Sequence, residues 1–302
     1  MSPSISPVQR VSVDVWGGLG NRLFMVAAGL LESRKLGCPL SLCSGTQFED
    51  ISELLGGLEI PVLAGVALEA RGPAASKVGI GRRIAERLGA IVRSHLPIAF
   101  EDTANGRVSD RVVDGANTRV MHGYFQDLRL VRQATDAGWP RAVQLPGNSM
   151  ISASRLRGRL PDNFIGLHIR LGDYTLPVNQ RKLGLPDPSF YRRAIDEVTG
   201  VLGRALPIVL FSDSPQEARD LLATVGIGHG AVLGPSDTGS EAEALWLLSQ
   251  ASAVVLSNST FGWWGAYWGG SDRPVACPAP WHDRVNSQAL IDPTWIQIAK
   301  NP

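Results

Sequence analysis

The second half of the chain alternates short apolar runs with segments whose apolar residues recur at helical spacing. The apolar runs have the length and the β-branched content of buried strands, and strands are expected at residues 164–170, 208–212, 231–233, 253–257 and 274–277. Helices are expected between them, at residues 189–202, 215–225, 241–251 and 262–268. Five strands that alternate with four helices predict a parallel sheet with helices on both faces.

The first half opens with the same order of elements and then becomes less regular. Residues 11–16 alternate β-branched with other residues, which predicts a strand, and a glycine-rich turn and a helical pattern over 22–35 follow. The pattern of apolar and polar residues is less regular between about residues 45 and 115. Within that stretch, residues 80–96 have an apolar face and several arginines, which predicts a basic amphipathic helix. The charged face of this helix either is simply solvated or contacts a membrane surface or an anionic acceptor.

Length and composition favour two packed domains. The chain has 302 residues, of which 44% are hydrophobic and 19% charged, so it has ample material for a core and does not resemble a disordered chain. A plausible junction begins at Pro146, which predicts an N-terminal domain over 1–150 and a C-terminal domain over 151–302. The net charge of +1 gives no global field for nucleic acid, so any anion needs a local site.

The cysteines and the termini predict a cytoplasmic protein. The three cysteines, at 38, 43 and 277, have no zinc-finger or redox spacing and favour a reducing compartment. No apolar run reaches the roughly 18 residues of a membrane span, and residues 1–10 lack the apolar region of a signal peptide. A peripheral contact with the inner face of the membrane through 80–96 stays an alternative.

Polar clusters follow the expected strands at their carboxyl ends, where sheets of this kind bind ligands. His168 and Arg170 share one face of a strand and either converge on a ligand or form a structural ion-pair network. Asp213 ends the next strand and either bonds across the sheet or caps the following helix. Ser259 and Thr260 join a strand directly to a helix start, which favours an anion.

Several chemistries are disfavoured by missing patterns. The sequence has no Asp-x-Asp pair and no His/Cys cluster with ligand spacing, so no metal is expected. It has no Gly-x-Ser-x-Gly nucleophile turn and no phosphate loop of the Gly-x-x-x-x-Gly-Lys type. The glycines at 17, 18 and 20 do not fit the dinucleotide spacing, which counts against a nicotinamide dehydrogenase.

Taken together and in order, five strings resemble glycosyltransferase family 11, the α-1,2-fucosyltransferases. They are GGLGNRLF at 17–24, GYFQ at 123–126, HIRLGDY at 168–174, FSD at 211–213 and NSTFGWWGA at 258–266. The resemblance implies an α/β, GT-B-like fold of two Rossmann-like domains with a cleft between them. It also implies inverting transfer of L-fucose from GDP-β-L-fucose to the 2-hydroxyl of a terminal galactose, without a metal or other cofactor.

The resemblance also implies roles for individual residues. Arg170 is expected on the β-phosphate and His168 near the nucleoside. The hydroxyls of Ser259 and Thr260 are expected at the phosphates, next to Phe261 of the same string. Asn21 is expected to face the donor from the first domain, and Asp213 is also expected among the residues that bind the donor.

The sequence departs from the family pattern at four places, two of which are Arg22 in place of a glutamine and Gly262 in place of a serine. Leu171 stands where the family usually has a second arginine, and Ala244 stands where it commonly has an aspartate, with Glu243 beside it as the expected reader of the guanine edge. Asp173 is the nearest matched carboxylate for a general base. The alternatives to a fucosyltransferase are a transferase with another sugar nucleotide or linkage, and a non-catalytic glycan- or nucleotide-binding protein.

Overall fold

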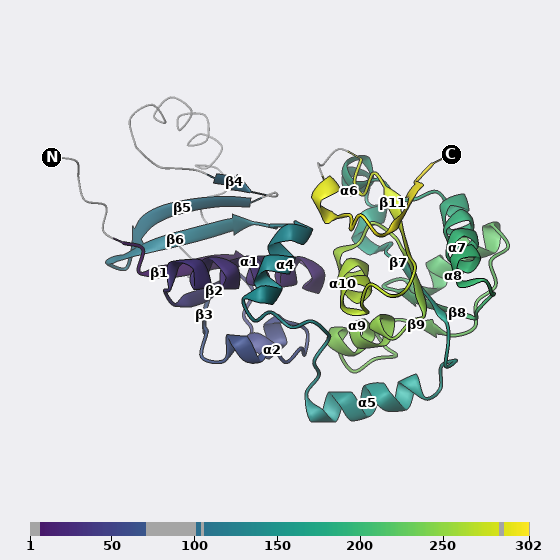
Figure 1. Cartoon of the computed structure of the whole chain (residues 1–302), viewed down its shortest axis with the longest axis horizontal. Coiled ribbons are helices and arrows are strands. Elements are labelled where there is room, and N and C mark those ends of the chain that lie inside the picture. Colours follow the sequence, from purple (N-terminus) through teal and green to yellow (C-terminus); the bar gives the residue numbers. More distant parts are fainter. Residues whose placement is uncertain (1–6, 71–100, 104–105, 284–286, 302) are drawn as a thin grey trace.

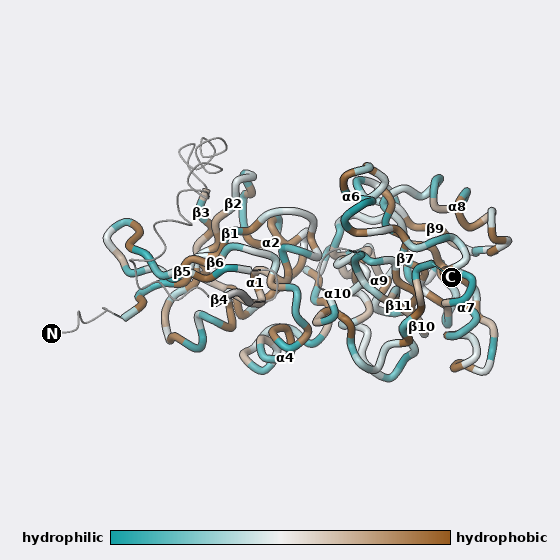
Figure 2. The backbone as a smooth tube through the Cα atoms, turned by 90° about the horizontal axis from the view of Figure 1, so that it is seen from above, coloured by the Kyte–Doolittle hydropathy of each residue, from teal (hydrophilic) through white to brown (hydrophobic). Residues whose placement is uncertain are grey.

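The computed structural model describes residues 7–70, 101–103, 106–283 and 287–301, and it contains two six-stranded sheets (Figure 1). The expected helix at 80–96 lies outside these described residues. Seen from above, the two halves lie side by side along the long axis of the molecule, with apolar segments along the inner strands and helices of each (Figure 2). The architecture is therefore α/β with two sheet-based domains.

The first sheet has the strand order β3-β2-β1-β6-β5-β4. Its strands are β1 (Arg10–Val15), β2 (Leu40–Ser44), β3 (Ala67–Ala70), β4 (Glu101–Thr103), β5 (Gly106–Val113) and β6 (Ala116–Gly123). Strands β3, β2, β1 and β6 are parallel, whereas β5 and β4 are antiparallel additions at one edge. The helical segments of this half are α1 (Leu19–Leu36), α2 (Ile51–Leu54), η1 (Pro61–Leu63) and α4 (Leu128–Asp136).

The second sheet is parallel throughout and has the order β12-β11-β10-β7-β8-β9. Its strands are β7 (Ile165–Ile169), β8 (Ile208–Ser212), β9 (Val232–Leu233), β10 (Ala253–Leu256), β11 (Val275–Ala279) and β12 (Ile296–Ala299). The accompanying helical segments are α5 (Gly147–Arg157), η3 (Gly172–Thr175), α6 (Pro177–Leu183), α7 (Pro188–Leu202), α8 (Pro215–Thr224), α9 (Glu241–Ser249), α10 (Thr260–Trp268) and η4 (Gln288–Leu290).

Strand alternation divides the helices between the two faces of the second sheet. Ile165, Leu167 and Ile169 of β7 join one apolar cluster with α7 and α8. Gly166 faces the other way, where a Cβ atom on it would come within 3.0 Å of side chains of Leu248 and Ala251 around the end of α9. The next residue on that face is His168, which therefore points toward α9 and α10 rather than toward α7 and α8.

The apolar core on the α9–α10 side continues into the first domain without a break. Trp264 of α10 is fully buried, its ring lies 4.9 Å from that of Phe24 in α1, and its Nε1 donates to the carbonyl of Gly20 at 3.0 Å. Gly20 fits there because it has no side chain: a Cβ atom would lie 2.4 Å from the carbonyl carbon of Thr260. The two domains thus share one core at the first turns of α1 and α10.

The expected elements of the second half are confirmed, with small shifts at their ends. Helix α10 begins at Thr260 rather than at 262, and the sheet gains β12, which the sequence analysis did not predict. In the first half, β1 and α1 are confirmed, but the remaining strands of that sheet were missed. The boundary expected at 150 falls inside α5 and stays a prediction. No helix in the described ranges is long and apolar enough to cross a membrane.

Replacing Trp264 with alanine tests the shared core. The substitution removes a fully buried indole, its contact with Phe24 and its hydrogen bond to Gly20. We expect the free energy of unfolding to fall by about 3–5 kcal/mol in a denaturant titration. Val201→Ala, at an exposed position of α7, is the control and should stay within about 0.5 kcal/mol of the wild type. Equal stability of both variants would show that α10 does not anchor the domains.

Candidate active site

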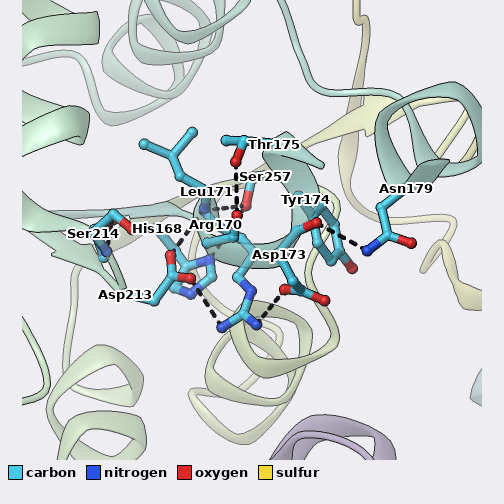
Figure 3. A network of polar contacts seen from close by, with 12 residues as sticks. His168, Arg170, Leu171, Asp173, Tyr174, Thr175, Asn179, Asp213, Ser214 and Ser257 are labelled. Carbon is cyan, nitrogen blue, oxygen red and sulfur yellow. Dashed lines mark hydrogen bonds and ion pairs between the residues drawn. The ribbon is translucent and has the colours of Figure 1, made fainter. Parts of the chain in front are cut away.

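The carboxyl ends of β7, β8 and β10 bring three polar residues together (Figure 3). The guanidinium of Arg170 lies 3.1 Å from the carboxylate of Asp213, and the backbone N–H of Arg170 donates to the hydroxyl of Ser257 at 3.0 Å. The other oxygen of Asp213 accepts from the backbone N–H of Leu171 at 2.9 Å. Of the two alternatives for Asp213, the structure shows the bond across the sheet, since α8 begins without a side-chain cap.

A second carboxylate holds the same guanidinium from the turn after β7. Asp173 in η3 accepts from Nη2 of Arg170 at 2.6 Å, so Arg170 lies between two carboxylates. Burial acts to lower the pKa of Arg170, but the charges of Asp213 and Asp173 raise it above its usual value. Arg170 therefore stays charged while 36% of its side chain remains accessible. One oxygen of Asp173, expected as a candidate base, is engaged in this ion pair, and 53% of the side chain stays accessible.

The turn after β7 requires a glycine at position 172. Gly172 has a φ of +22°, and a Cβ atom there would lie 2.2 Å from Oδ2 of Asp213. Leu171 itself is buried in the apolar cluster beside α7, which explains why an apolar residue stands where the family pattern has an arginine. The second arginine of the pattern has no equivalent at this position.

His168 lies beneath the start of α10 and is 5% exposed. Burial, reinforced by the charge of Arg170, lowers its pKa to about 3, so the imidazole is neutral at physiological pH. Its ring stacks with Phe261 at 5.5 Å, and its Nδ1 is 3.4 Å from the hydroxyl of Ser257. Gly262 allows this packing, because a Cβ atom there would lie 2.8 Å from Nδ1. His168 supports the strand ends and helix start rather than supplying a charge.

Helix α10 begins at the seam between the domains, and no side chain caps its first N–H groups in the described structure. Ser259 precedes the helix without capping it by its side chain, and the first turn has no acidic residue. Thr260 donates its hydroxyl to Oδ1 of Asn21 at 2.9 Å, and Gln126 donates to the same oxygen at 2.9 Å. The structure therefore brings Asn21 of the first domain to Thr260, as expected from their shared site. The Thr260 hydroxyl, however, is directed at Asn21 in this arrangement.

Helix α1, like helix α10, begins without a side-chain cap. Gly18 gives it no side-chain cap, and its first turn also lacks an acidic residue. The two first turns touch, as the close approach of Gly20 to Thr260 shows. Because the N-terminus of a helix carries partial positive charge, two such ends face one seam, beside the guanidinium of Arg170.

Glu243 is buried at the start of α9 and takes part in local hydrogen bonds. Its Oε2 accepts from the backbone N–H of Gly239 at 3.0 Å, and its own N–H donates to the hydroxyl of Ser240 at 3.2 Å. Both bonds shape the loop that follows β9. No described hydrogen bond joins Glu243 to the network of Figure 3.

Sequence reasoning missed three residues that this geometry brings in. Ser257 accepts from Arg170, Gln126 holds Asn21, and the hydroxyl of Tyr174 donates to the carbonyl of Asn258 at 3.3 Å. Two of them, Gln126 and Tyr174, lie within the strings already singled out, so their position in a motif was the available signal. For Ser257 the signal was its place directly after a buried strand.

A cavity of about 450 Å³ lies elsewhere, between α4, the end of α10 and residues 292–295. Its lining includes Arg132, Tyr267 and Trp295, and none of the site residues expected from the sequence. Within the described ranges, no three His, Cys, Asp or Glu side chains gather into a metal-ligating group. Independence from metal stays a prediction.

Gly172→Ala tests whether the turn fixes the ion pair. The added methyl group would overlap the carboxylate of Asp213, so the substitution should cost about 1–3 kcal/mol of unfolding free energy beyond its matched control. That control is Gly203→Ala, where φ is also positive, at 65°, but a Cβ atom meets nothing within 4 Å. Denaturant titrations of both variants measure the difference. Equal losses would mean that the turn can shift without disturbing Asp213.

Known proteins resemble this chain in sequence and in fold. Among curated relatives, the O-antigen biosynthesis glycosyltransferase WbnK of Escherichia coli is 30% identical over 138 residues, covering 45% of each chain. The galactoside 2-alpha-L-fucosyltransferase Sec1 of Mus musculus is 26% identical over 163 residues, covering 52% of this chain and 44% of that protein. The alpha-1,2-colitosyltransferase of Escherichia coli is 28% identical over 167 residues, covering 53% and 56%. The chain thus spans about half the length of these relatives.

Solved structures show the same two-domain, GT-B-like arrangement. Fucosyltransferase NodZ from Bradyrhizobium matches with a TM-score of 0.50 and 15% identity, over 86% of this chain and 92% of that chain. A family 9 glycosyl transferase from Veillonella parvula also matches with a TM-score of 0.50, at 12% identity, over 97% and 87%. The family model for glycosyl transferase family 11 matches residues 115–299, which include the strand ends, η3 and α10 described above. This chain belongs to glycosyl transferase family 11.

Proposed function

We propose that this protein transfers L-fucose from GDP-β-L-fucose, with inversion, to the 2-hydroxyl of a terminal galactose. The observation that carries the proposal is the position of Arg170, a charged and partly accessible guanidinium at the end of β7, whose backbone N–H bonds Ser257 just before the uncapped start of α10. Both features favour a diphosphate, since one supplies a fork of donors and the other supplies free N–H groups. Family membership and the fucosyltransferases among the relatives support fucose as the sugar that is transferred.

The chemistry asks the protein to stabilise a leaving group. As the bond between fucosyl carbon 1 and the diphosphate oxygen breaks, negative charge grows on GDP. Arg170 and the N–H groups at the start of α10 face that charge from fixed positions, so little reorganisation is needed during the reaction. Asp213 and Asp173 act as positioning residues, because their ion pairs hold the guanidinium at the strand ends.

The remaining residues are proposed to bind the rest of the donor. Ser259 directly precedes α10 without capping it, and we assign its hydroxyl to the phosphates. Thr260 and Asn21 link the domains at the same point, and Phe261 with the neutral His168 forms an apolar support for the nucleoside side. Glu243 would use its second carboxylate oxygen for the N–H groups of the guanine edge. We also propose that transfer needs no metal.

A second candidate is transfer of a different deoxy sugar. The relative named as an alpha-1,2-colitosyltransferase matches as large a share of this chain as the fucosyltransferases do. Leu171, which leaves the proposed donor position without a second arginine, is one of the residues of this chain that depart from the usual pattern. A comparison of fucosyl and colitosyl donors with the same acceptor decides between the two sugars.

An assay with GDP-fucose and a panel of galactosides tests the proposed function. We expect free GDP and a fucosylated product, identified by mass and by NMR as the α-1,2-linked sugar, and we expect both in the presence of EDTA. GDP, unlike NAD, should raise the melting temperature, because a ligand that binds the native state stabilises it. Stabilisation by GDP without a product from either sugar would indicate a binding protein, and stabilisation by NAD alone would refute a transferase.

Substitutions of Arg170 test its role at the phosphates. Arg170→Ala should lower kcat/KM by about a hundredfold to a thousandfold, or roughly 3–4 kcal/mol, because it removes a fixed donor to the leaving group. Arg170→Lys should recover little of this loss, since an ammonium group cannot bind two phosphate oxygens as a fork. Arg204→Ala, at an exposed position before β8, is the matched control. Activity above half of the wild type in Arg170→Ala would place the phosphate site elsewhere.

A further inference from the structure

Three half-buried aromatic rings form a row at the carboxyl ends of β1 and β6, in the first domain. Trp16 stacks on the imidazole of His122 with ring centroids 4.6 Å apart, and it contacts Tyr124 at 5.5 Å. The parallel register of β1 and β6 places these residues together, and alternation puts them on the face opposite α1. We call these three residues the aromatic row. None of them has a role in the donor site described above.

The imidazole in this row is held by a carboxylate. Nδ1 of His122 lies 2.8 Å from Oδ2 of Asp14, whose side chain is almost fully buried, while 38% of the His122 side chain is accessible. A carboxylate at Nδ1 favours the tautomer with its proton on that nitrogen, which leaves Nε2 as a proton acceptor. A buried carboxylate also stabilises the imidazolium that forms when Nε2 takes up a proton.

The aromatic row lies next to the donor site, across the seam between the domains. Two residues beyond Tyr124, Gln126 donates to Asn21, which in turn accepts from Thr260 at the start of α10. On the other side of the seam, the hydroxyl of Tyr174 donates to the carbonyl of Asn258 at 3.3 Å, two residues before Thr260. Tyr174 belongs to the same turn as Asp173, beside Arg170.

The chain between the row and the seam is fixed in an unusual conformation. Phe125 has a φ of 51°, in the left-handed region that a phenylalanine rarely adopts. Its buried ring holds the conformation, since it packs on Gly106, where a Cβ atom would lie 2.2 Å from the ring. Strain of this kind persists where the surroundings over-determine it, and here it sets the directions of Tyr124 and Gln126.

We propose that the aromatic row binds the acceptor sugar and that His122, oriented by Asp14, is the general base of the transfer. Galactose presents an apolar face of C–H groups that fits against stacked aromatic rings. This inference rests on the proposed function and deepens it, because it assigns the acceptor side of the same reaction. It also assigns the role of base to His122, which, unlike Asp173, is not paired with Arg170.

The acceptor O–H bond breaks and its proton passes to Nε2 of His122. The electron pair of that bond forms the new bond from oxygen to fucosyl carbon 1, and the electron pair of the broken bond to the diphosphate leaves with GDP. A positioned base of this kind contributes about 10²–10⁴-fold to a rate.

The test separates the base from a structural histidine. His122→Asn keeps a donor toward Asp14 but has no proton acceptor in the place of Nε2. We expect kcat to fall at least about a hundredfold, with the GDP-induced rise in melting temperature unchanged. Added imidazole should restore part of the activity of His122→Ala. His229→Asn, in the loop after α8, is the matched control and should transfer like the wild type.

The pH profile gives a second readout. A general base must be able to accept a proton, so the dependence of kcat on pH should differ between the wild type and His122→Asn. The charged groups beside His122 on the described neighbouring strands are Asp14 on β1 and Arg107, paired with it on β5. An unchanged kcat in His122→Asn, a loss that imidazole does not restore, or identical pH profiles of the two proteins would each overturn the base.

A binding measurement tests the aromatic row without the donor. Trp16→Leu should weaken binding of β-methyl galactoside, followed by NMR titration, by about tenfold, because it removes the central ring of the row. Undiminished binding, or no binding by the wild type, would overturn the acceptor site. If the wild type transfers no sugar, the proposed function and the base both fail, and this titration alone decides whether the row binds a sugar.

Discussion

The contact between the first turns of α1 and α10 is the constraint on which the rest of the structure depends. Gly20 lets the two backbones meet, and the indole of Trp264 holds them by its bond to the Gly20 carbonyl. Because both helices follow strands directly, this contact places the carboxyl ends of the two sheets at one seam. The residues at the ends of β7 and β8 that we propose to bind the donor, and the aromatic row on β1 and β6, are therefore parts of one arrangement.

The second sheet could be predicted from the sequence because its strands are buried on both faces. Continuous runs such as Ile208–Ser212 have no polar alternation to obscure them, and helices of clear period separate them. The first sheet was harder. Its strand Gly106–Val113 is an antiparallel addition with many exposed residues, and Leu40–Ser44 follows a proline after only a short break. Pairing with partners distant in sequence, rather than local pattern, defines these strands.

The residues of the site that lie at the strand ends could be predicted from the sequence, but their hydrogen-bond partners could not. Alternation placed His168 and Arg170 on one face, and the sheet topology brought Asp213 to Arg170. The partner of the Thr260 hydroxyl could not be foreseen, since Asn21 lies 239 residues away in sequence. Nor could the neutral state of His168, which depends on how α10 covers the strand. Side chains at strand ends follow from local pattern, whereas their hydrogen-bond partners follow from the packing of whole domains.

The two uncapped helix starts have a consequence for the protein without its ligand. Their positive ends face each other across the seam with no acidic side chain in either first turn, so like partial charges oppose the closeness that Trp264 and Gly20 impose. A bound anion would remove this opposition. An anion at this seam would therefore strengthen the contact between the two halves of the molecule, in addition to binding at the strand ends.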